Sequence, residues 1–328
     1  MKYLITGGAG FIGSHLADYL IERGHKVHVL DNLSTGSREN IDRLAQNDQY
    51  EYTIGSILDY QTTEKLVAEC DQIFHLAAAV GVKWIMERPV ETIETNVHGT
   101  ENMLRLASYF GKKILVASTS EVYGKSMETS GKNMLSEADD WTLGTTTKRR
   151  WAYACSKALD EFLSLAYYDE RQLPVVVARF FNTVGPRQRG RYGMVIPNFV
   201  QAALQNRPIT VFGDGKQTRC FTYVSDAVGA VARLMDEPEA EGKVLNIGGG
   251  EEISMNELAK RVVELTGSTS VIEHVTYEEA YGRGYEDMRR RTPDISKLQS
   301  IISYEPNVSI DLIIREVAAY YRGIGVVA

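Results

Sequence analysis

Hydrophobic residues in the first half of the chain fall into short runs that are separated by longer amphipathic segments. The runs predict β-strands at 2–6, 26–30, 51–54, 71–75, 113–118 and 174–180, and a later run predicts a returning strand at 243–247. The intervening segments predict helices from Phe11 to about Arg23, from Pro89 to about Phe110 and from Trp151 to about Tyr168. Strands that alternate with helices are typical of βαβ units, so we expect an α/β fold with a parallel sheet.

Glycines follow the first predicted strand directly, in the sequence Gly7-Gly-Ala-Gly10-Phe11-Ile12-Gly13. This spacing suits a dinucleotide-binding turn. Gly7 permits a sharp exit from the strand, Gly10 lets the backbone approach a pyrophosphate, and Gly13 lets the next helix pack closely. The free N–H groups at the start of that helix would bind the pyrophosphate. Taken alone, the motif could also be an ordinary tight turn.

The strands and this turn together predict a Rossmann-type, doubly wound parallel sheet with a smaller C-terminal substrate-binding domain. We expect residues 1–182, with a returning segment at about 223–250, to form the NAD-binding domain. Glycine and proline interrupt the pattern in much of the remainder. Residues 183–222 and 251–328 are therefore expected to form the smaller substrate-binding domain, which the resemblance given below identifies as nucleotide-sugar-binding.

Asp31 ends the second predicted strand, where a carboxylate can accept hydrogen bonds from the adenosine ribose hydroxyls of a dinucleotide. A 2′-phosphate at this place would meet a like charge, so NAD is favoured over NADP. A simple Asx turn is the alternative interpretation. The other expected NAD contacts follow successive strands and are Asn32, Ser34, Thr35, Gly36, Ser56, Ile57, Leu76, Ala77 and Ala78.

Tyr153 and Lys157 lie four residues apart in a predicted helix and therefore share one helix face. There the Lys157 ammonium can lower the pKa of the Tyr153 phenol, so that it takes a proton from a sugar hydroxyl. A pair of surface residues is the alternative. Together with the glycine motif, this pair indicates an enzyme, and both residues are also expected to contact NAD.

Composition narrows the partners and the compartment. The net charge of −7 over 328 residues argues against a general nucleic-acid binder, which would normally carry a basic face. No segment resembles a membrane span, and the N-terminus runs directly into the first strand, so no membrane partner or signal peptide is expected. The three scattered cysteines, Cys70, Cys155 and Cys220, favour a cytoplasmic protein with no disulfide framework and no metal site.

With the glycine loop, the segment Thr119-Ser120-Glu121-Val-Tyr123-Gly124 and the Tyr153–Lys157 pair, the chain resembles the extended short-chain dehydrogenase/reductase family over nearly its whole length. These are nucleotide-sugar epimerases, dehydratases and decarboxylases. The resemblance implies that Tyr153 is the base for the sugar C4 hydroxyl while NAD takes the C4 hydride. Lys157 would bind the nicotinamide ribose, and Thr119 or Ser120 would hydrogen-bond the same sugar oxygen. It also implies a homodimer in which the helices at 89–110 and 151–168 pair as a four-helix bundle.

Glu121, directly after Thr119 and Ser120, resembles the arrangement in UDP-glucuronate decarboxylases and in some 4,6-dehydratases. A carboxylate satisfied by local backbone N–H groups is the alternative. The stretches 281–294 and 148–153 resemble UDP-glucuronate-decarboxylating enzymes, which implies that Arg291 faces the reacting sugar. A guanidinium suits a uronate carboxylate because its planar fork pairs both oxygens. A solvated loop at 289–291, or an arginine that serves the nucleotide, remains open.

The resemblance also assigns the nucleotide contacts. It implies that Arg219 binds the pyrophosphate, that Asn182 contacts a phosphate and that a helix near Val195 lies beside the uracil. Arg187 and Arg189 could equally be surface charges. Apiose synthases, one of the similar groups, carry Cys where this chain has Ser120, which makes apiose formation doubtful.

The resemblance leads us to expect an NAD-dependent UDP-glucuronate decarboxylase that oxidises C4, loses the C5 carboxylate as CO2 and re-reduces C4 to give UDP-xylose. A UDP-hexose 4-epimerase and a nucleotide-sugar 4,6-dehydratase remain enzymatic alternatives. A non-catalytic NAD-binding protein is the alternative of another class. The intact Thr119, Tyr153 and Lys157 argue against it, because binding alone requires no matched acid–base pair.

Overall fold

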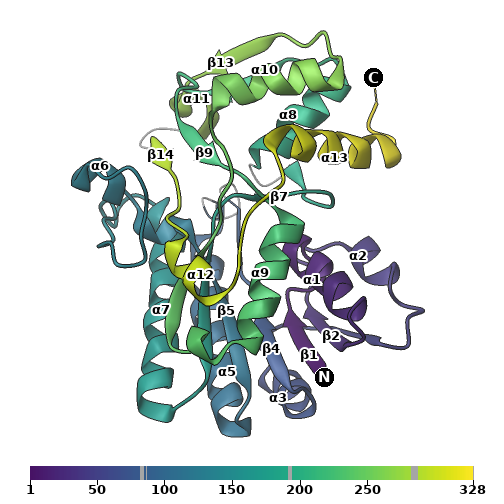
Figure 1. Ribbon diagram of the computed structural model, residues 1–328, viewed down its shortest axis with the longest axis vertical. Coiled ribbons are helices and arrows are strands. Elements are labelled where there is room, and N and C mark those ends of the chain that lie inside the picture. Colours follow the sequence, from purple (N-terminus) through teal and green to yellow (C-terminus); the bar gives the residue numbers. More distant parts are fainter. Residues whose placement is uncertain (82–84, 86, 191–193, 282–286, 328) are drawn as a thin grey trace.

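The computed structural model describes residues 1–328 except 82–84, 86, 191–193, 282–286 and 328. Its centre is a seven-stranded sheet in the order β11-β6-β5-β4-β1-β2-β3, with every neighbouring pair parallel (Figure 1). The strands are β1 (Lys2–Thr6), β2 (Lys26–Asp31), β3 (Tyr50–Ile54), β4 (Gln72–His75), β5 (Lys113–Thr119), β6 (Val175–Phe180) and β11 (Lys243–Ile247). Each predicted strand is thus confirmed to within one residue at either end, including the returning strand at 243–247.

The strand order reverses between β1 and β4, and this reversal positions the site. In doubly wound sheets, ligands bind in the crevice outside the carboxyl ends of the strands at such a switch point. The glycine loop follows β1 and the segment Leu76–Ala79 follows β4, so both border this crevice. The predicted Rossmann-type sheet is confirmed.

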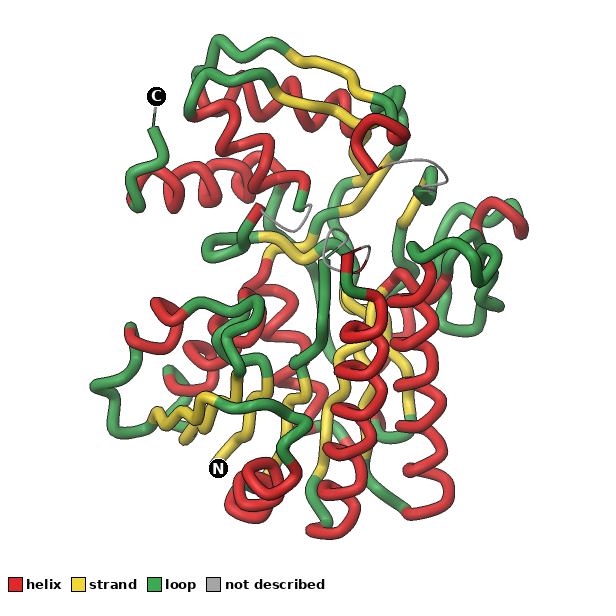
Figure 2. Tube along the Cα trace, turned by 180° about the vertical axis from the view of Figure 1, so that it is seen from behind, coloured by secondary structure: helices red, strands yellow, loops and turns green. Residues whose placement is uncertain are grey.

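Helices cover both faces of the sheet, because alternate side chains of each strand point to opposite faces. Tyr3 and Ile5 pack with α1 (Phe11–Ile21) and α9 (Val224–Asp236). Leu4 instead belongs to a core shared with the helices of the other face. Those helices are α3 (Tyr60–Glu69), α5 (Pro89–Phe110) and α7 (Trp151–Arg171), and the last two run side by side (Figure 2).

Two of the predicted helix ends differ from the observed ones. The first helix stops two residues early, because Gly24 turns the chain with a φ of +78° and donates to the Ile21 carbonyl. Helix α7 continues three residues beyond Tyr168, where Gln172 adopts the left-handed conformation that closes it. The helix from Pro89 to Phe110 is confirmed at both ends.

A second hydrophobic core lies above the carboxyl ends of the sheet (Figure 1). It packs α8 (Val195–Leu204), α10 (Met255–Thr266) and α13 (Ile310–Gly323) around the parallel pair β8 (Ile209–Phe212) and β13 (Ile272–Val275). Three further strands connect this core to the crevice, namely β9 (Thr218–Cys220), β12 (Glu252–Ser254) and β14 (Arg290–Arg291).

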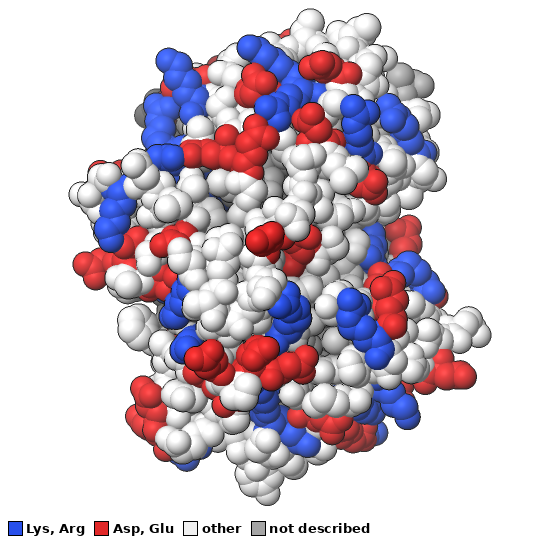
Figure 3. Space-filling view, in the orientation of Figure 1, with Lys and Arg blue, Asp and Glu red and all other residues white. Residues whose placement is uncertain are grey.

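The remaining described elements are short. They are α2 (Arg38–Asp42), η1 (Ser120–Tyr123), α6 (Ser126–Ser130), β7 (Thr183–Val184), β10 (Thr222–Tyr223), η3 (Pro238–Ala240), α11 (Tyr277–Tyr281) and α12 (Ser296–Ile301). On the face that Figure 3 shows, acidic and basic side chains are interspersed. Within the described part of the chain, no helix has both the length and the apolar character needed to cross a membrane.

Candidate active site

The glycine loop requires glycine at two of its positions. Gly7 has a φ of +74°, and a Cβ there would lie 2.8 Å from the backbone nitrogen of Ala77. A Cβ on Gly13 would collide with the carbonyl oxygen of Gly7, so close packing of α1 against the loop also needs glycine. No side chain caps the N-terminus of α1 at Gly10, which leaves its first N–H groups facing the crevice.

Asp31 ties the end of β2 to this loop. Its carboxylate accepts hydrogen bonds from the N–H groups of Ala9, at 3.0 Å, and Leu33, at 2.7 Å. Burial raises the pKa of the Asp31 carboxyl, while these two hydrogen bonds work to lower it. The contact with Leu33 is the Asx turn that we considered as an alternative, and Asp31 lines the cavity as well. Asp31 therefore holds the loop in place and also lines the cavity in which a cofactor is expected.

A cavity of about 780 Å³ extends from the glycine loop, across the carboxyl ends of the strands, to the second core. Nearly all of the predicted site residues line it: Gly7, Gly10, Phe11, Ile12, Gly13, Asp31, Asn32, Ser34, Thr35, Ile57, Leu76, Ala77, Ala78, Thr119, Ser120, Glu121, Tyr153, Lys157, Asn182, Val195, Arg219 and Arg291.

Gly36 and Ser56 are the two predicted contacts that are not among the lining residues. Gly36 packs against Ala9, and a Cβ on it would lie 2.9 Å from the Ala9 Cβ. The Ser56 hydroxyl accepts a hydrogen bond from the Leu58 N–H group at 3.1 Å, as an ordinary turn residue does.

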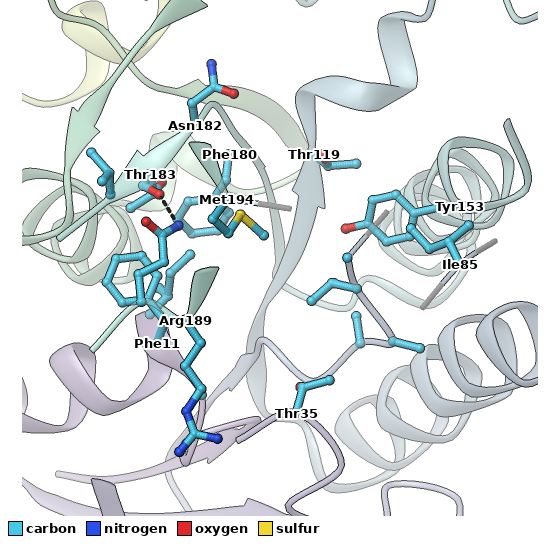
Figure 4. A pocket seen from close by; sticks show the side chains of 18 of the residues that line it. Phe11, Thr35, Ile85, Thr119, Tyr153, Phe180, Asn182, Thr183, Arg189 and Met194 are labelled. Atoms are coloured by element: carbon cyan, nitrogen blue, oxygen red, sulfur yellow. Dashed lines mark hydrogen bonds between the residues drawn. The ribbon is translucent and has the colours of Figure 1, made fainter. Parts of the chain in front are cut away.

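Tyr153 points into the middle of the cavity, with Thr119 beside it (Figure 4). The two hydroxyl groups are hydrogen-bonded, and Thr119 also accepts from the Glu121 N–H group at 3.2 Å. Burial raises the pKa of the Tyr153 phenol, and the negative charges of Glu121 and Asp160 raise it further. The hydrogen bond from Thr119 and the charge of Arg291 act in the lowering direction but do not outweigh these effects.

The pKa of Tyr153 is therefore shifted in the direction opposite to the one that the Tyr–Lys spacing suggested. The main physical reason is burial of the phenol, and the negative charges of Glu121 and Asp160 add to it. The Lys157 ammonium lies 2.7 Å from the Asp160 carboxylate. Both side chains are almost fully buried. Asp160 was not anticipated from the sequence, although its spacing of three residues from Lys157 on one helix was a usable signal.

Glu121 lies between two guanidinium groups. Arg291 contacts one carboxylate oxygen, and Arg150 lies 2.6 Å from the other. Burial alone would raise the pKa of the Glu121 carboxyl, but the charges of Arg150 and Arg291 outweigh it and lower this pKa to about 2. The Glu121 carboxylate is thus ionised and held by cations that come from distant parts of the chain, rather than by local backbone groups.

Arg291 and its two neighbours point to different places. Arg289 pairs with Asp214 at 2.8 Å and Arg290 pairs with Glu252 at 2.5 Å, both away from the reacting centre. Arg291 faces inward, where its guanidinium also donates to the Asn182 side-chain oxygen. The solvated-loop interpretation thus fits Arg289, whereas Arg291 lies in the cavity. Residues 282–286 of the same stretch lie outside the described residues.

The expected phosphate ligand Arg219 is buried beside Asp287, with its guanidinium 3.0 Å from that carboxylate. The Asp287 carboxylate also lies 3.9 Å from Arg150. Arg150 and Asp287 are the main site residues that sequence reasoning missed. Arg150 could have been found from its place three residues before Tyr153, whereas nothing in the local sequence marks Asp287.

Two further arginines reach the glycine-loop side of the cavity. Arg187 pairs with Asp18 at 2.9 Å and contacts His15. Arg189 donates to the Ser37 hydroxyl at 2.8 Å. Val195 begins α8 and lines the cavity, while Gly193 lies outside the described residues.

Comparison with known proteins agrees with this geometry. The chain matches the family model described as GDP-mannose 4,6 dehydratase over residues 4–317. It is 47% identical over 324 residues to a UDP-N-acetyl-alpha-D-glucosaminuronate decarboxylase from Bacillus cytotoxicus, covering 98% of each chain. It is 38% identical over 310 residues to UDP-glucuronic acid decarboxylase 1 from Arabidopsis thaliana, covering 94% of this chain and 67% of the plant protein.

Among solved structures, the chain resembles a UDP-glucuronic acid 4-epimerase from Bacillus cereus in complex with UDP-glucuronic acid and NAD. The TM-score is 0.88 and the identity 27%, over 99% of this chain and 100% of the other. The similarity in sequence and the similarity in fold therefore both extend over nearly the full length of the chain. The chain belongs to the GDP-mannose 4,6 dehydratase family of nucleotide-sugar enzymes, within the extended short-chain dehydrogenases/reductases.

Proposed function

We propose that the protein is an NAD-dependent decarboxylase of a UDP-linked hexuronate, converting UDP-glucuronate to UDP-xylose. The observation that carries this proposal is the pairing of two guanidinium groups, Arg150 and Arg291, with the single carboxylate of Glu121 beside Tyr153. With Arg219 and Asp287 included, the cluster holds three guanidinium groups and two carboxylates, and a substrate carboxylate would compensate the remaining positive charge. A neutral hexose offers no such group at C5.

The residues of the crevice fit NAD. Gly7 and Gly13 leave room that a Cβ would fill, and Asp31 lines the cavity where an adenosine ribose would lie. The related epimerase from Bacillus cereus was solved with NAD, which supports the same cofactor here. Bound NAD supplies the acceptor for the C4 hydride and returns it at the end of the cycle.

Three side chains of the site have separate roles in the remaining steps. Tyr153, hydrogen-bonded to Thr119, is placed to take the proton of the C4 hydroxyl. Arg291 would orient the uronate carboxylate, which leaves as CO2 once C4 is a ketone, because the resulting enolate is stabilised by that carbonyl. C5 must then gain a proton. Glu121 is ionised and has no proton to give, so it would orient a water molecule that delivers one.

A second substrate has a specific observation in its favour. The relative that acts on UDP-N-acetylglucosaminuronate is 47% identical, whereas the plant UDP-glucuronic acid decarboxylase is 38% identical. The two substrates differ at C2 and share the C4 hydroxyl and the C5 carboxylate on which the mechanism depends. Decarboxylation of the 2-acetamido sugar is therefore the second candidate function, with the same roles for Tyr153 and Arg291.

The experiment that tests the proposal incubates purified protein and NAD separately with UDP-glucuronate, UDP-N-acetylglucosaminuronate, UDP-glucose and dTDP-glucose, with mass detection of the products. We expect loss of CO2 from one or both uronates and no reaction of the neutral hexoses. Epimerised UDP-glucose without decarboxylation would favour a 4-epimerase. Loss of water from dTDP-glucose would favour a 4,6-dehydratase, and NAD binding without turnover of any sugar would favour a non-catalytic protein.

We expect the protein to bind NAD more tightly than NADP, because the Asp31 carboxylate would repel a 2′-phosphate and Asn32 supplies no compensating charge. Calorimetry with both cofactors measures the difference. Asp31→Ser combined with Asn32→Arg should narrow the difference in affinity between NAD and NADP. Equal affinities in the wild-type protein would remove the role assigned to Asp31.

The hydrophobic cores on the two faces of the sheet and the separate core above it support a division in which residues 1–182 and 223–250 bind NAD and residues 183–222 and 251–328 bind the nucleotide sugar. The segment around α12 departs from this division, since Leu298, Ile302 and Tyr304 pack into the core of the main sheet. A cytoplasmic location is part of the same proposal, since Cys70, Cys155 and Cys220 are free thiols.

We also propose that the protein forms a homodimer through α5 and α7. Large apolar side chains are exposed on both helices, among them Ile93, Tyr109, Leu159 and Phe162, the last at 62%. Phe162→Glu should yield a monomer by light scattering at micromolar concentration. The matched control is Val271→Glu, which changes an equally exposed apolar residue outside these helices and should leave the dimer intact. A monomeric wild-type protein would contradict the proposal.

A further inference from the structure

The two arginines that hold Glu121 differ in how they are anchored. Arg150 immediately precedes α7, is only 5% exposed and lies with its guanidinium 5.5 Å from the centre of the Trp151 ring. Arg291 lies on the two-residue strand β14 and shares its guanidinium between Glu121 and Asn182. Arg291 therefore divides its hydrogen bonds between two partners in the cavity, whereas Arg150 is more deeply buried and lies beside Trp151, with Asp287 as a second, more distant carboxylate.

A substrate carboxylate changes the pairing in this cluster. Two guanidinium groups and one carboxylate leave one cation to spare, and two guanidinium groups and two carboxylates match one to one. If Arg291 turns to the uronate, Glu121 loses one of its two partners. A buried carboxylate that kept no cationic partner would become protonated or would move. Glu121 can stay ionised and in place only if its other partner remains.

We propose that Arg150 is a positioning residue that holds the Glu121 carboxylate in place while Arg291 pairs with the carboxylate of the substrate. The proposal rests on the proposed decarboxylase function and adds a residue that the mechanism otherwise leaves without a role. Arg150 then acts through Glu121 and makes no contact of its own with the reacting carbon.

Other charged groups around Glu121 bear on this proposal. Arg219 on β9 is near enough for the charge of Glu121 to affect its pKa, and the Tyr153 phenol on α7 is affected in the same way. The carboxylate of Asp287 lies 3.0 Å from Arg219 and 3.9 Å from Arg150. Arg219 is thus already paired with a carboxylate, so Arg150 and Arg291 are the groups that contact Glu121 directly.

The sign of the pH effect follows from this arrangement. The positive charges of Arg150 and Arg291 lower the pKa of Glu121 to about 2, against the effect of burial. Removal of Arg150 raises this pKa, so that Glu121 becomes protonated at a higher pH. If turnover needs ionised Glu121, acidification will inactivate the variant at a higher pH than the wild-type protein.

The test compares Arg150→Met with Arg149→Met, a matched substitution at the exposed neighbouring arginine. For Arg150→Met we expect kcat for the uronate to fall by up to about 100-fold. The acid limb of its pH profile should move upward by about 1–3 pH units. Binding of UDP and of NAD, measured by calorimetry, should stay near wild type. Arg149→Met should behave as wild type in all of these measurements.

Three results would overturn the proposal. An unshifted pH profile, with the loss confined to binding of the uronate, would make Arg150 a direct ligand of the substrate carboxylate. Wild-type kcat in Arg150→Met would mean that Glu121 needs no such partner. In a Glu121→Gln background, Arg150→Met should cause little further loss of kcat, and an additive loss would also refute the proposal.

If Arg150→Met fails to fold, Arg150→Lys decides instead. It retains the charge and should keep the acid limb close to its wild-type position, while kcat falls because one ammonium cannot reproduce the geometry of the guanidinium. If the acid limb of the pH profile shifts in Arg150→Lys as far as is expected for Arg150→Met, the proposal is refuted. Release of CO2 by the wild-type protein tests the proposed function itself. The ratio of the variant's kcat to the wild-type kcat tests the role of Arg150.

Discussion

Arg291→Met is expected to reduce kcat/KM for UDP-glucuronate by about 30- to 1,000-fold while NAD binding is unchanged. Loss of a charged hydrogen-bond pair in a buried site costs about 2–4 kcal/mol, which corresponds to this range. In this protein the loss has two parts. The substrate carboxylate loses its guanidinium partner, and the Asn182 side-chain oxygen loses the donor that contacts it. Steady-state kinetics with both uronates, together with calorimetry for NAD, measures the effect.

The matched control is Arg289→Met, since Arg289 carries the same side chain two residues earlier but pairs with Asp214 outside the reacting centre. It should retain most of the activity. Arg291→Lys should recover only part of the loss, because an ammonium does not reproduce the two-pronged contact with a carboxylate. Unchanged decarboxylation in Arg291→Met would exclude Arg291 as the uronate ligand and would favour the epimerase alternative.

Tyr153→Phe is expected to abolish measurable turnover and to leave NAD binding nearly intact. The substitution removes one oxygen, which points into the cavity beside Thr119 (Figure 4). General acid–base groups contribute about 10²- to 10⁴-fold to rate, so the expected loss lies in this range. Calorimetry for NAD and thermal unfolding show whether the cavity is preserved, since only the hydroxyl is missing.

Tyr109→Phe is the matched control, because Tyr109 is 78% exposed on α5 and far from the chemistry. It should leave the rate unchanged. Retention of more than about a tenth of the wild-type rate in Tyr153→Phe would mean that another group takes the C4 proton, given the usual contribution of such a base. Lys157→Met is a weaker test of the same centre, since it would also leave the buried Asp160 carboxylate without its partner.

The sequence by itself determined the strands and the glycine turn that follows β1. Apolar runs such as Tyr3-Leu4-Ile5 bury side chains on both faces of a parallel sheet, so their position fixes the strands. Gly7 and Gly13 are confined to glycine by backbone contacts within a few residues or at the neighbouring strand end. These are local constraints, and local sequence expresses them.

Only the tertiary structure decided how the charges of the site are paired. Glu121 and Arg291 are 170 positions apart, yet their side chains meet because η1 follows β5 at the crevice and β14 crosses above it. Burial of the Tyr153 phenol, with the nearby charges of Glu121 and Asp160, reversed the expected direction of its pKa shift, and the fold brought Arg150 to 2.6 Å from Glu121. Electrostatic interactions depend on distance and burial in three dimensions, and neither quantity can be obtained from the spacing of residues along a chain.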